Sequence, residues 1–195
     1  RLVDAHCHLY CPEFQGKEET ILASAKQVGV VGLISAATQL SDWEGHIRLA
    51  VRYPEVKCAL GVHPWYAQPE DVSKIVSLES AHEKGAIAIG EIGLDSKIAS
   101  PPFELQAALF EKQLGIARDL NLPVVVHCRG AFNQLISTVK RVGLPERGGI
   151  IHAYSGSPEI TQELIRLGFS FSMGRALTYR NSPKRAEVLR VIFPE

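Results

Sequence analysis

Four histidines and one glutamate stand in or at the ends of otherwise apolar runs of this sequence: His6, His8, Glu91, His127 and His152. Imidazole-rich ligation suits Zn²⁺, Mn²⁺ or Fe²⁺, and a mixed histidine and carboxylate site also admits Mg²⁺. A carboxylate inside an apolar strand is costly to bury unless it is paired or bound to a cation. Two ions bridged by such a carboxylate would clamp a phosphodiester and activate a water molecule. The set therefore predicts a divalent metal centre with hydrolytic chemistry.

Each member of this set also has a simpler interpretation when it is taken alone. His6 and His8 share one face of a strand, because side chains alternate, and an isolated H-x-H is commonly a hydrogen-bonded pair. A zinc site that adds Cys7 and Cys11 is opposed by the same alternation. Glu91 could pair with an arginine. It is the placement of all these residues at strand ends that favours the metal centre.

Two further residues follow apolar strands and are candidates for substrate binding. His63, in GVHPW, could donate to a substrate oxygen or only cap a loop. Arg129, directly after HC, could hold a phosphate through its planar guanidinium or form an ion pair at the rim. Trp65 could stack on a base or lie in a loop.

Short apolar runs alternate with amphipathic runs along the chain, and the elements that must position these residues follow from that rhythm. Near-continuous apolar stretches are typical of parallel strands that are covered on both faces. We expect strands at 2–9, 30–37, 56–63, 86–94, 123–128, 149–154 and 169–174. We expect helices near 17–28, 42–53, 69–84, 102–120, 132–142, 158–167 and 182–193. Glycines such as Gly29 and Gly168 follow helical runs, where a left-handed cap belongs.

The polar residues lie at the carboxyl ends of many different strands, and this decides between two α/β architectures. A doubly wound sheet concentrates its site at one switch point, whereas a barrel gathers all strand ends around one mouth. The fold predicted is therefore a TIM-type (β/α)₈ barrel that lacks its last strand. We expect residues 1–195 to form one domain, with a C-terminal βα portion absent from the sequence.

The composition is that of an ordinary globular protein, and its charge limits the kinds of partner that the chain could bind. The chain has 21 basic and 21 acidic residues, so it lacks the basic footprint of a protein that grips a long duplex. No apolar run is long enough to cross a membrane. Four scattered cysteines favour a reducing compartment, and we expect a cytoplasmic protein.

Five segments, in order, are VDAHCHL, LGVHP, IGEIGLD, LPVVVHCR and IHAYSGS. With this ordered set the sequence resembles the TatD family of metal-dependent deoxyribonucleases, within the amidohydrolase-like metallohydrolases. The resemblance implies a binuclear centre in which Glu91 is shared, with His6 and His8 on one ion and His127 and His152 on the other. It also implies hydrolysis of phosphodiester bonds at DNA ends, with Glu91, His127 and His152 as the catalytic residues.

The sequence departs from the family pattern at three places. Tyr10 stands where an Asp usually follows H-x-H, and Gly130 stands where an acidic residue is common. The final Asp ligand of the family has no counterpart, since the last aspartate is Asp119. Two alternatives to a DNA nuclease therefore stay open. One is a metallohydrolase of small esters or amides, and the other is an inactive metal-binding fragment.

Overall fold

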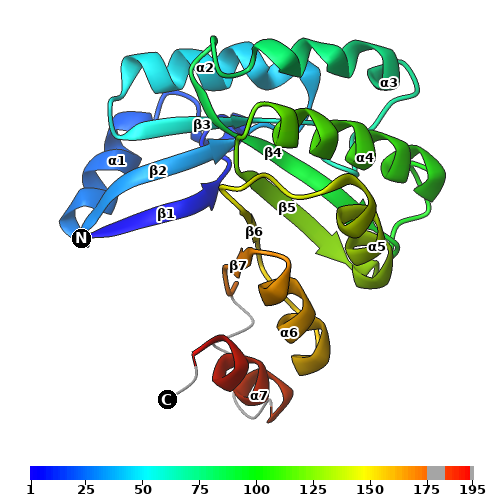
Figure 1. The fold of residues 1–195 in the computed structure, drawn as a ribbon. Coiled ribbons are helices and arrows are strands. Elements are labelled where there is room, and N and C mark those ends of the chain that lie inside the picture. The colour runs from blue at the N-terminus through cyan, green and yellow to red at the C-terminus, as the bar shows by residue number, and fades with distance from the viewer. Residues whose placement is uncertain (175–182, 194–195) are drawn as a thin grey trace.

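The computed structural model describes residues 1–174 and 183–193, and within them one sheet carries seven parallel strands in sequence order. The sheet curls from β1 to β7, which are its two edges in the described part of the chain (Figure 1). Sequential parallel pairing with helical crossovers is the arrangement of a TIM-type barrel, as predicted. The strands are β1 (Leu2–Cys7), β2 (Val30–Ala36), β3 (Val56–Leu60), β4 (Ala86–Asp95), β5 (Val124–Arg129), β6 (Gly149–Ile151) and β7 (Phe169–Phe171).

Helices follow the strands, and α2, α4 and α5 lie against the convex side of the sheet (Figure 1). Their apolar faces and the outward side chains of the central strands form the main core, in which Phe110 and Leu60 are fully buried. The helices are α1 (Glu18–Gln27), α2 (Trp43–Arg52), α3 (Asp71–Lys74), α4 (Phe103–Asp119), α5 (Phe132–Val142), α6 (Pro158–Arg166) and α7 (Pro183–Ile192). Short 3-10 turns add η1 (Pro12–Phe14), η2 (Leu40–Asp42) and η3 (Ile75–Ser80).

Small side chains line the concave face of the sheet. Ala36, Ala59, Ala88 and Val125 form a separate buried cluster there, one from each of the four strands β2 to β5. Their neighbours along β3 and β5 pack in the main core on the other face, as alternation along a strand requires. The strand ends can therefore converge above this cluster, which is where the candidate site lies.

The alternation of strands and helices predicted from the sequence is confirmed, with one exception in helix type and several in length. The run at 69–84 was expected to be one helix, but it is the four-residue α3 followed by η3. The last two strands are shorter than predicted and end at Ile151 and Phe171. Gly29 and Gly168 have positive φ angles of 89° and 97°, as their place after helices predicted.

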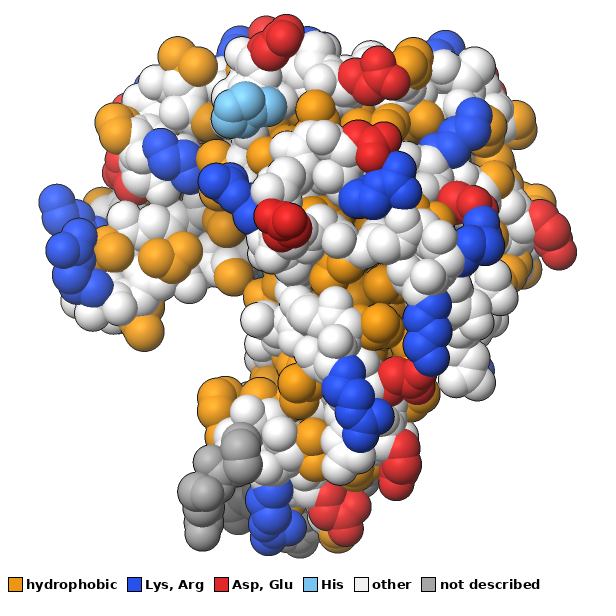
Figure 2. All heavy atoms as spheres, in the orientation of Figure 1, with side chains coloured by type: hydrophobic (Ala, Val, Ile, Leu, Met, Phe, Trp, Pro, Cys, Tyr) orange, Lys and Arg blue, Asp and Glu red, His pale blue; other side chains and the backbone are white. Residues whose placement is uncertain are grey.

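Charged side chains are spread over the outer surface rather than gathered. On the face that Figure 2 draws, basic and acidic side chains are interspersed, with apolar side chains between them. Several helix-surface charges are paired, such as Lys140 with Glu163 and Arg141 with Glu111. Among the described residues, no helix is long and apolar enough to cross a membrane.

Candidate metal centre

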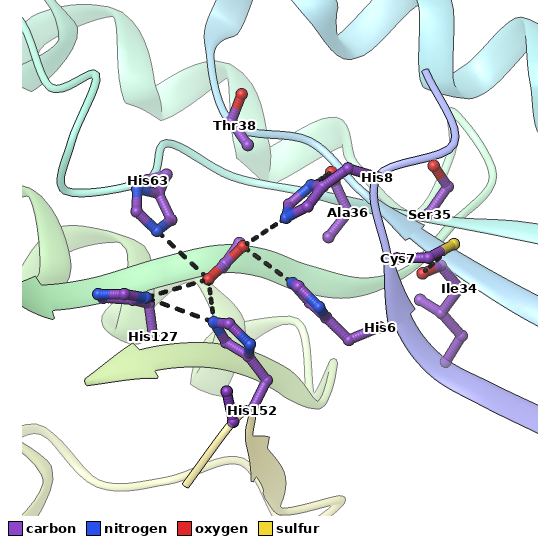
Figure 3. Close-up of polar contacts among 12 residues, drawn as sticks. His6, Cys7, His8, Ile34, Ser35, Ala36, Thr38, His63, His127 and His152 are labelled. Atoms are coloured by element: carbon purple, nitrogen blue, oxygen red, sulfur yellow. Dashed lines mark hydrogen bonds and ion pairs between the residues drawn. The ribbon is translucent and has the colours of Figure 1, made fainter. Parts of the chain in front are cut away.

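The carboxylate of Glu91 lies at the centre of a cluster of five histidines. Three imidazole nitrogens lie near Oε1: Nε2 of His152 at 2.5 Å, Nε2 of His63 at 3.3 Å and Nδ1 of His127 at 3.5 Å. Two lie near Oε2: Nε2 of His6 at 2.9 Å and Nε2 of His8 at 3.2 Å. Figure 3 shows the five rings converging from different strand ends on the carboxylate between them. The structure therefore brings together all five residues predicted as ligands, and adds His63.

Glycines on β4 and just after β3 allow this convergence. A Cβ on Gly93 would overlap the backbone of His127, and its φ of 145° is one that other residues rarely adopt. A Cβ on Gly61 would lie 2.8 Å from Ile92, and one on Gly90 would lie 2.6 Å from Val125. The GEIG segment therefore places Glu91 where neighbouring strands approach most closely.

The donor set fits a divalent metal centre. The ligand atoms of His6, His8 and Glu91 lie within 4.8 Å of one another, and so do those of His63, Glu91 and His127. Glu91 is 1% exposed, and its Oε1 accepts no well-aligned hydrogen bond among the described residues although three imidazole nitrogens lie within 3.5 Å of it. A buried carboxylate oxygen crowded by imidazole nitrogens in this way is a costly arrangement that a shared cation would satisfy.

Two histidines have the tautomer that a metal ligand needs, because their other ring nitrogen meets an acceptor. Nδ1 of His8 donates to the carbonyl oxygen of Ala36 at 2.9 Å, which leaves the lone pair of Nε2 toward Glu91. Nε2 of His127 lies 3.0 Å from Asp95 Oδ2, so it carries the proton and leaves the lone pair of Nδ1 toward Glu91. Such outer partners orient metal-bound imidazoles and raise their basicity.

His63 has the opposite tautomer, because its Nδ1 accepts the backbone N–H of Trp65 at 3.0 Å. Its proton therefore lies on Nε2, which faces Glu91 Oε1 at 3.3 Å. An imidazole nitrogen that carries a proton donates a hydrogen bond and does not ligate a metal. The cluster thus contains a fixed donor beside the candidate ligands, so His63 does more than cap its loop.

Asp95 was missed in the sequence, although it is central to the site. It is fully buried, and it binds His127, the indole N–H of Trp65 at 2.7 Å and the backbone N–H of Lys97 at 2.8 Å. The signal was available, since Asp95 stands four residues after Glu91 on the same strand and so shares its face. Trp65 links Asp95 to His63, because its indole N–H binds Asp95 and its backbone N–H binds His63.

Two buried glutamines of α4 hold the strand ends that carry these residues. Gln113 accepts from the backbone N–H of Val62 at 2.7 Å and donates to its carbonyl at 3.1 Å, directly before His63. Gln106 accepts from the backbone N–H of Asp95 at 2.9 Å. The two glutamines are seven residues apart and lie on one face of the helix. From the convex face of the sheet, α4 therefore holds the carboxyl ends of β3 and β4 in place at the site.

The protonation of the cluster follows from these contacts. Burial raises the pKa of Glu91, but the contacts with His127, His152 and His6 outweigh it and hold that pKa well below its usual range. The contact with Glu91 raises the pKa of His8. Burial lowers the pKa of His127, but Glu91 and Asp95 more than offset it, so the net shift is upward. Burial lowers the pKa of His63. Glu91 is therefore anionic, and His63 is a neutral donor near pH 7.

A cavity of about 550 Å³ opens over the cluster. Its wall includes His8, His63, Glu91, His127 and His152, and then extends toward β2 and α2. None of the lining residues in the described part of the chain is a lysine or an arginine. Arg129 is exposed at the end of β5 and is not part of this wall, so the structure does not bring it to the cluster.

Comparisons with known proteins find relatives over nearly the whole chain. The model of the family described as TatD related DNase matches residues 3–195. An uncharacterized metal-dependent hydrolase of Escherichia coli K12, YjjV, is 35% identical over 97% of this chain and 74% of that protein. Human deoxyribonuclease TATDN3 is 33% identical over 88% of this chain and 67% of that protein.

Two solved structures of TatD proteins are also similar to this chain. The crystal structure of YjjV from Escherichia coli K12, a TatD homologue, aligns with a TM-score of 0.88 at 33% identity, over 96% of this chain and 73% of that one. A TatD family hydrolase from Entamoeba histolytica aligns with a TM-score of 0.78 at 21% identity, over 89% of this chain and 64% of that one, and so shows the shared fold.

Proposed function

Because the chain belongs to the TatD related DNase family of metal-dependent hydrolases, we propose that it cleaves phosphodiester bonds in DNA and trims strand ends. The name of the human relative, deoxyribonuclease TATDN3, supports DNA as the substrate. The four free cysteines are compatible with the cytoplasmic location that we also propose. The single observation that carries the proposal is the buried carboxylate of Glu91, surrounded by imidazole nitrogens and lining an open cavity.

We propose two divalent ions, Zn²⁺, Mg²⁺ or Mn²⁺, that share Glu91. His6 and His8 would complete one group, and His127 and His152 the other. We assign His152 rather than His63 to the second group, because Nε2 of His152 lies 2.5 Å from Glu91 Oε1 and 3.4 Å from Nδ1 of His127, whereas Nε2 of His63 carries a proton. When bound, such ions would polarise a phosphodiester and make an attacking hydroxide available near neutral pH.

The residues of the chain would then bind and orient the substrate. His63 is a fixed N–H donor at the cavity wall, so we propose that it donates to a substrate oxygen. Asp95 holds the proton on Nε2 of His127 and keeps the ring in one orientation during turnover. Arg129 stands at the rim of the strand ends, and we propose that it contacts a phosphate farther along the DNA strand. Glu91, His127 and His152 are the residues proposed to be catalytic.

End trimming is tested with two single strands of the same sequence, one linear and one circular. The metal-free protein is incubated with each strand after addition of Mg²⁺, Mn²⁺ or Zn²⁺, with a chelator as the control. We expect the linear strand to lose nucleotides from one end and the circular strand to stay intact. Cleavage of neither strand with any ion would contradict DNA hydrolysis. Equal cleavage of both would contradict end trimming.

A second candidate substrate class is a small ester or amide, and one observation favours it. The cavity wall carries Glu91 and Asp42 but no lysine or arginine among the described residues, so little holds a polyanion. Hydrolysis of uncharged aryl esters or amides by the metal-loaded protein, with no DNA cleavage, would select this candidate.

A further inference from the structure

Next to the metal centre, the same cavity extends into a lobe between β1 and α2. We define the lobe by Tyr10, Asp42 and His46, all of which line the cavity. The ring of Tyr10 lies 5.4 Å from that of His46 at a tilt of 55°. Among the described residues, neither Asp42 nor His46 belongs to a group of candidate metal ligands. The lobe therefore needs an explanation of its own.

The fold makes room for the ring of Tyr10. Gly45 lies inside α2, where glycine costs about 1 kcal/mol relative to alanine. A Cβ at Gly45 would overlap the Tyr10 ring, so the ring occupies the space that this glycine leaves open on the helix. Tyr10 is also the residue that replaces the aspartate expected after H-x-H. The Tyr10 ring is therefore accommodated by a specific gap in α2, the one that Gly45 leaves.

The lobe contains polar atoms that the protein leaves unpartnered. His46 is 2% exposed, and its only hydrogen bond among the described residues joins Nδ1 to the hydroxyl of Ser35 at 3.0 Å. In either tautomer, Nε2 is left with one hydrogen bond to make. About one turn earlier, at the end of η2, Asp42 uses Oδ2 to bind Thr38, while its buried Oδ1 has no hydrogen-bond partner among the described residues. A buried carboxylate oxygen without a partner, such as Oδ1 of Asp42, is uncommon, and a ligand is one way to satisfy it.

Charge excludes a phosphate as the ligand of this lobe. The one formal charge on its three defining residues is the carboxylate of Asp42, and the described cavity wall offers no lysine or arginine. An aromatic face beside hydrogen-bonding groups suits a planar, uncharged group that carries N–H donors. Nucleobases have this chemistry, since each has a flat face and polar edges.

We propose that Tyr10, His46 and Asp42 form a subsite that binds one nucleobase of the substrate while its phosphodiester lies at the metal centre. Tyr10 stacks on the base, and His46 and Asp42 bind its polar edge. The proposal rests on the proposed function for its choice of substrate, but base binding itself requires neither metal nor turnover.

The first test measures binding to the metal-free protein and is independent of catalysis. Thymidine, adenosine and 2-deoxyribose are titrated into the full chain, with binding followed by nuclear magnetic resonance of the ligand. We expect both nucleosides to bind and the sugar not to bind. Tyr10→Leu should weaken nucleoside binding about tenfold, the effect of losing a stacked aromatic ring. Tyr10→Phe keeps the ring and should stay within about twofold of the unaltered protein.

Equal binding of the sugar and the nucleosides, or no binding of either, would overturn the subsite. Unchanged nucleoside affinity in Tyr10→Leu would also overturn it, provided that thermal unfolding shows the variant to be folded. If Tyr10→Leu does not fold, His46→Phe serves instead, because it fills the buried space and removes Nε2; it also removes Nδ1 and its contact with Ser35, so its folding is checked by thermal unfolding too. It should weaken nucleoside binding about fivefold, the effect of one hydrogen bond, and no change would contradict the proposal.

The second test uses turnover and separates the subsite from the metal centre. Thymidine 5′-(p-nitrophenyl phosphate) carries a base, and methyl p-nitrophenyl phosphate does not. We expect Tyr10→Leu to lower kcat/KM about tenfold for the first ester and to leave the second within about twofold. Equal losses on both esters would overturn the subsite. If the unaltered protein cleaves neither ester, the proposed function fails, and nucleoside binding still decides the subsite.

Discussion

The five histidines around Glu91 differ in what holds their second ring nitrogen. In His8, His63 and His127 that nitrogen is bound by a protein partner: the carbonyl of Ala36, the backbone N–H of Trp65 and the carboxylate of Asp95. In His6 and His152 it has no hydrogen bond among the described residues, and the two rings stack on each other at 4.1 Å. The cluster thus has a fixed part and a part that is held by Glu91, by ring packing and, for His152, by a 3.4 Å contact with Nδ1 of His127.

This difference follows the sheet. The rings of His63 and His127 bond to the loop after β3 and to the end of β4, which α4 holds through its glutamines, and the ring of His8 bonds to the carbonyl of Ala36 at the end of β2. His6 comes from β1, whose first three residues are exposed at an edge of the sheet, and His152 follows the three-residue β6. Hydrogen bonds to the second ring nitrogen hold a ligand in place before a metal binds. A ligand without such a bond loses conformational entropy when the metal binds. The fixed part should therefore control chemistry, and the unfixed part should respond most to metal occupancy.

Glu91→Gln should have the largest effect, because Glu91 contacts both parts of the cluster. An amide cannot balance two cations, so we expect phosphodiesterase activity to fall on the order of 10³-fold or more. Activity is measured on a linear single strand, with circular dichroism as the control for folding. Rates near those of the unaltered protein would show that the shared carboxylate is not needed.

His63→Gln separates a donor from a ligand. Loss of a fixed donor at a developing charge should lower kcat about 10²-fold while the metal content stays the same. His152→Gln is the matched change in the unfixed part, and it should lower the metal content as well. Elemental mass spectrometry of both variants gives the comparison. A loss of metal in His63→Gln equal to that in His152→Gln would show that His63 is a ligand.

Asp95→Asn tests the outer contact of the fixed part. It removes the charge that holds the proton on Nε2 of His127, and losing such a contact typically weakens metal affinity by about 10- to 100-fold. The affinity is measured by competition with a chelating dye. Should the affinity remain unchanged, the orientation of His127 would not depend on Asp95.

The pH dependence of metal binding separately tests the two histidines whose pKa is raised. The pKa of His8 and of His127 is raised, so both keep their protons to higher pH, and a metal must displace them. Metal affinity should therefore fall as the pH is lowered from 8 to 6, by about tenfold per pH unit for each displaced proton. Chelator competition at three pH values measures the slope. A flat profile would mean that neither histidine is a ligand.

The sequence was sufficient for the fold and for the residues that converge. Strand and helix order followed from apolar runs separated by glycines, and most boundaries fall within a few residues of those predicted. The exception at 69–84 arose because periodicity does not distinguish an α-helix from a short α-helix followed by 3-10 turns. His6, His8, Glu91, His127 and His152 could be recognised because a polar residue in an apolar strand is conspicuous.

The details that give each residue its role depend on three-dimensional contacts. No sequence pattern shows that Trp65 donates to His63 while it also binds Asp95, so the donor role of His63 stayed one of two interpretations. Asp95 stands at the end of its strand, where a polar residue is common, so only its four-residue spacing from Glu91 could have marked it. Arg129 has the right residue type and follows the right strand, but its place outside the cavity wall depends on how β5 ends.

The most direct test of a shared-carboxylate metal centre is the metal content of the purified chain beside that of Glu91→Gln. Elemental mass spectrometry needs no assumption about the substrate. We expect about one to two equivalents of a divalent metal in the unaltered chain and clearly less in the variant. A chain that binds no metal after incubation with excess Zn²⁺, Mn²⁺ or Mg²⁺ would contradict the metal centre.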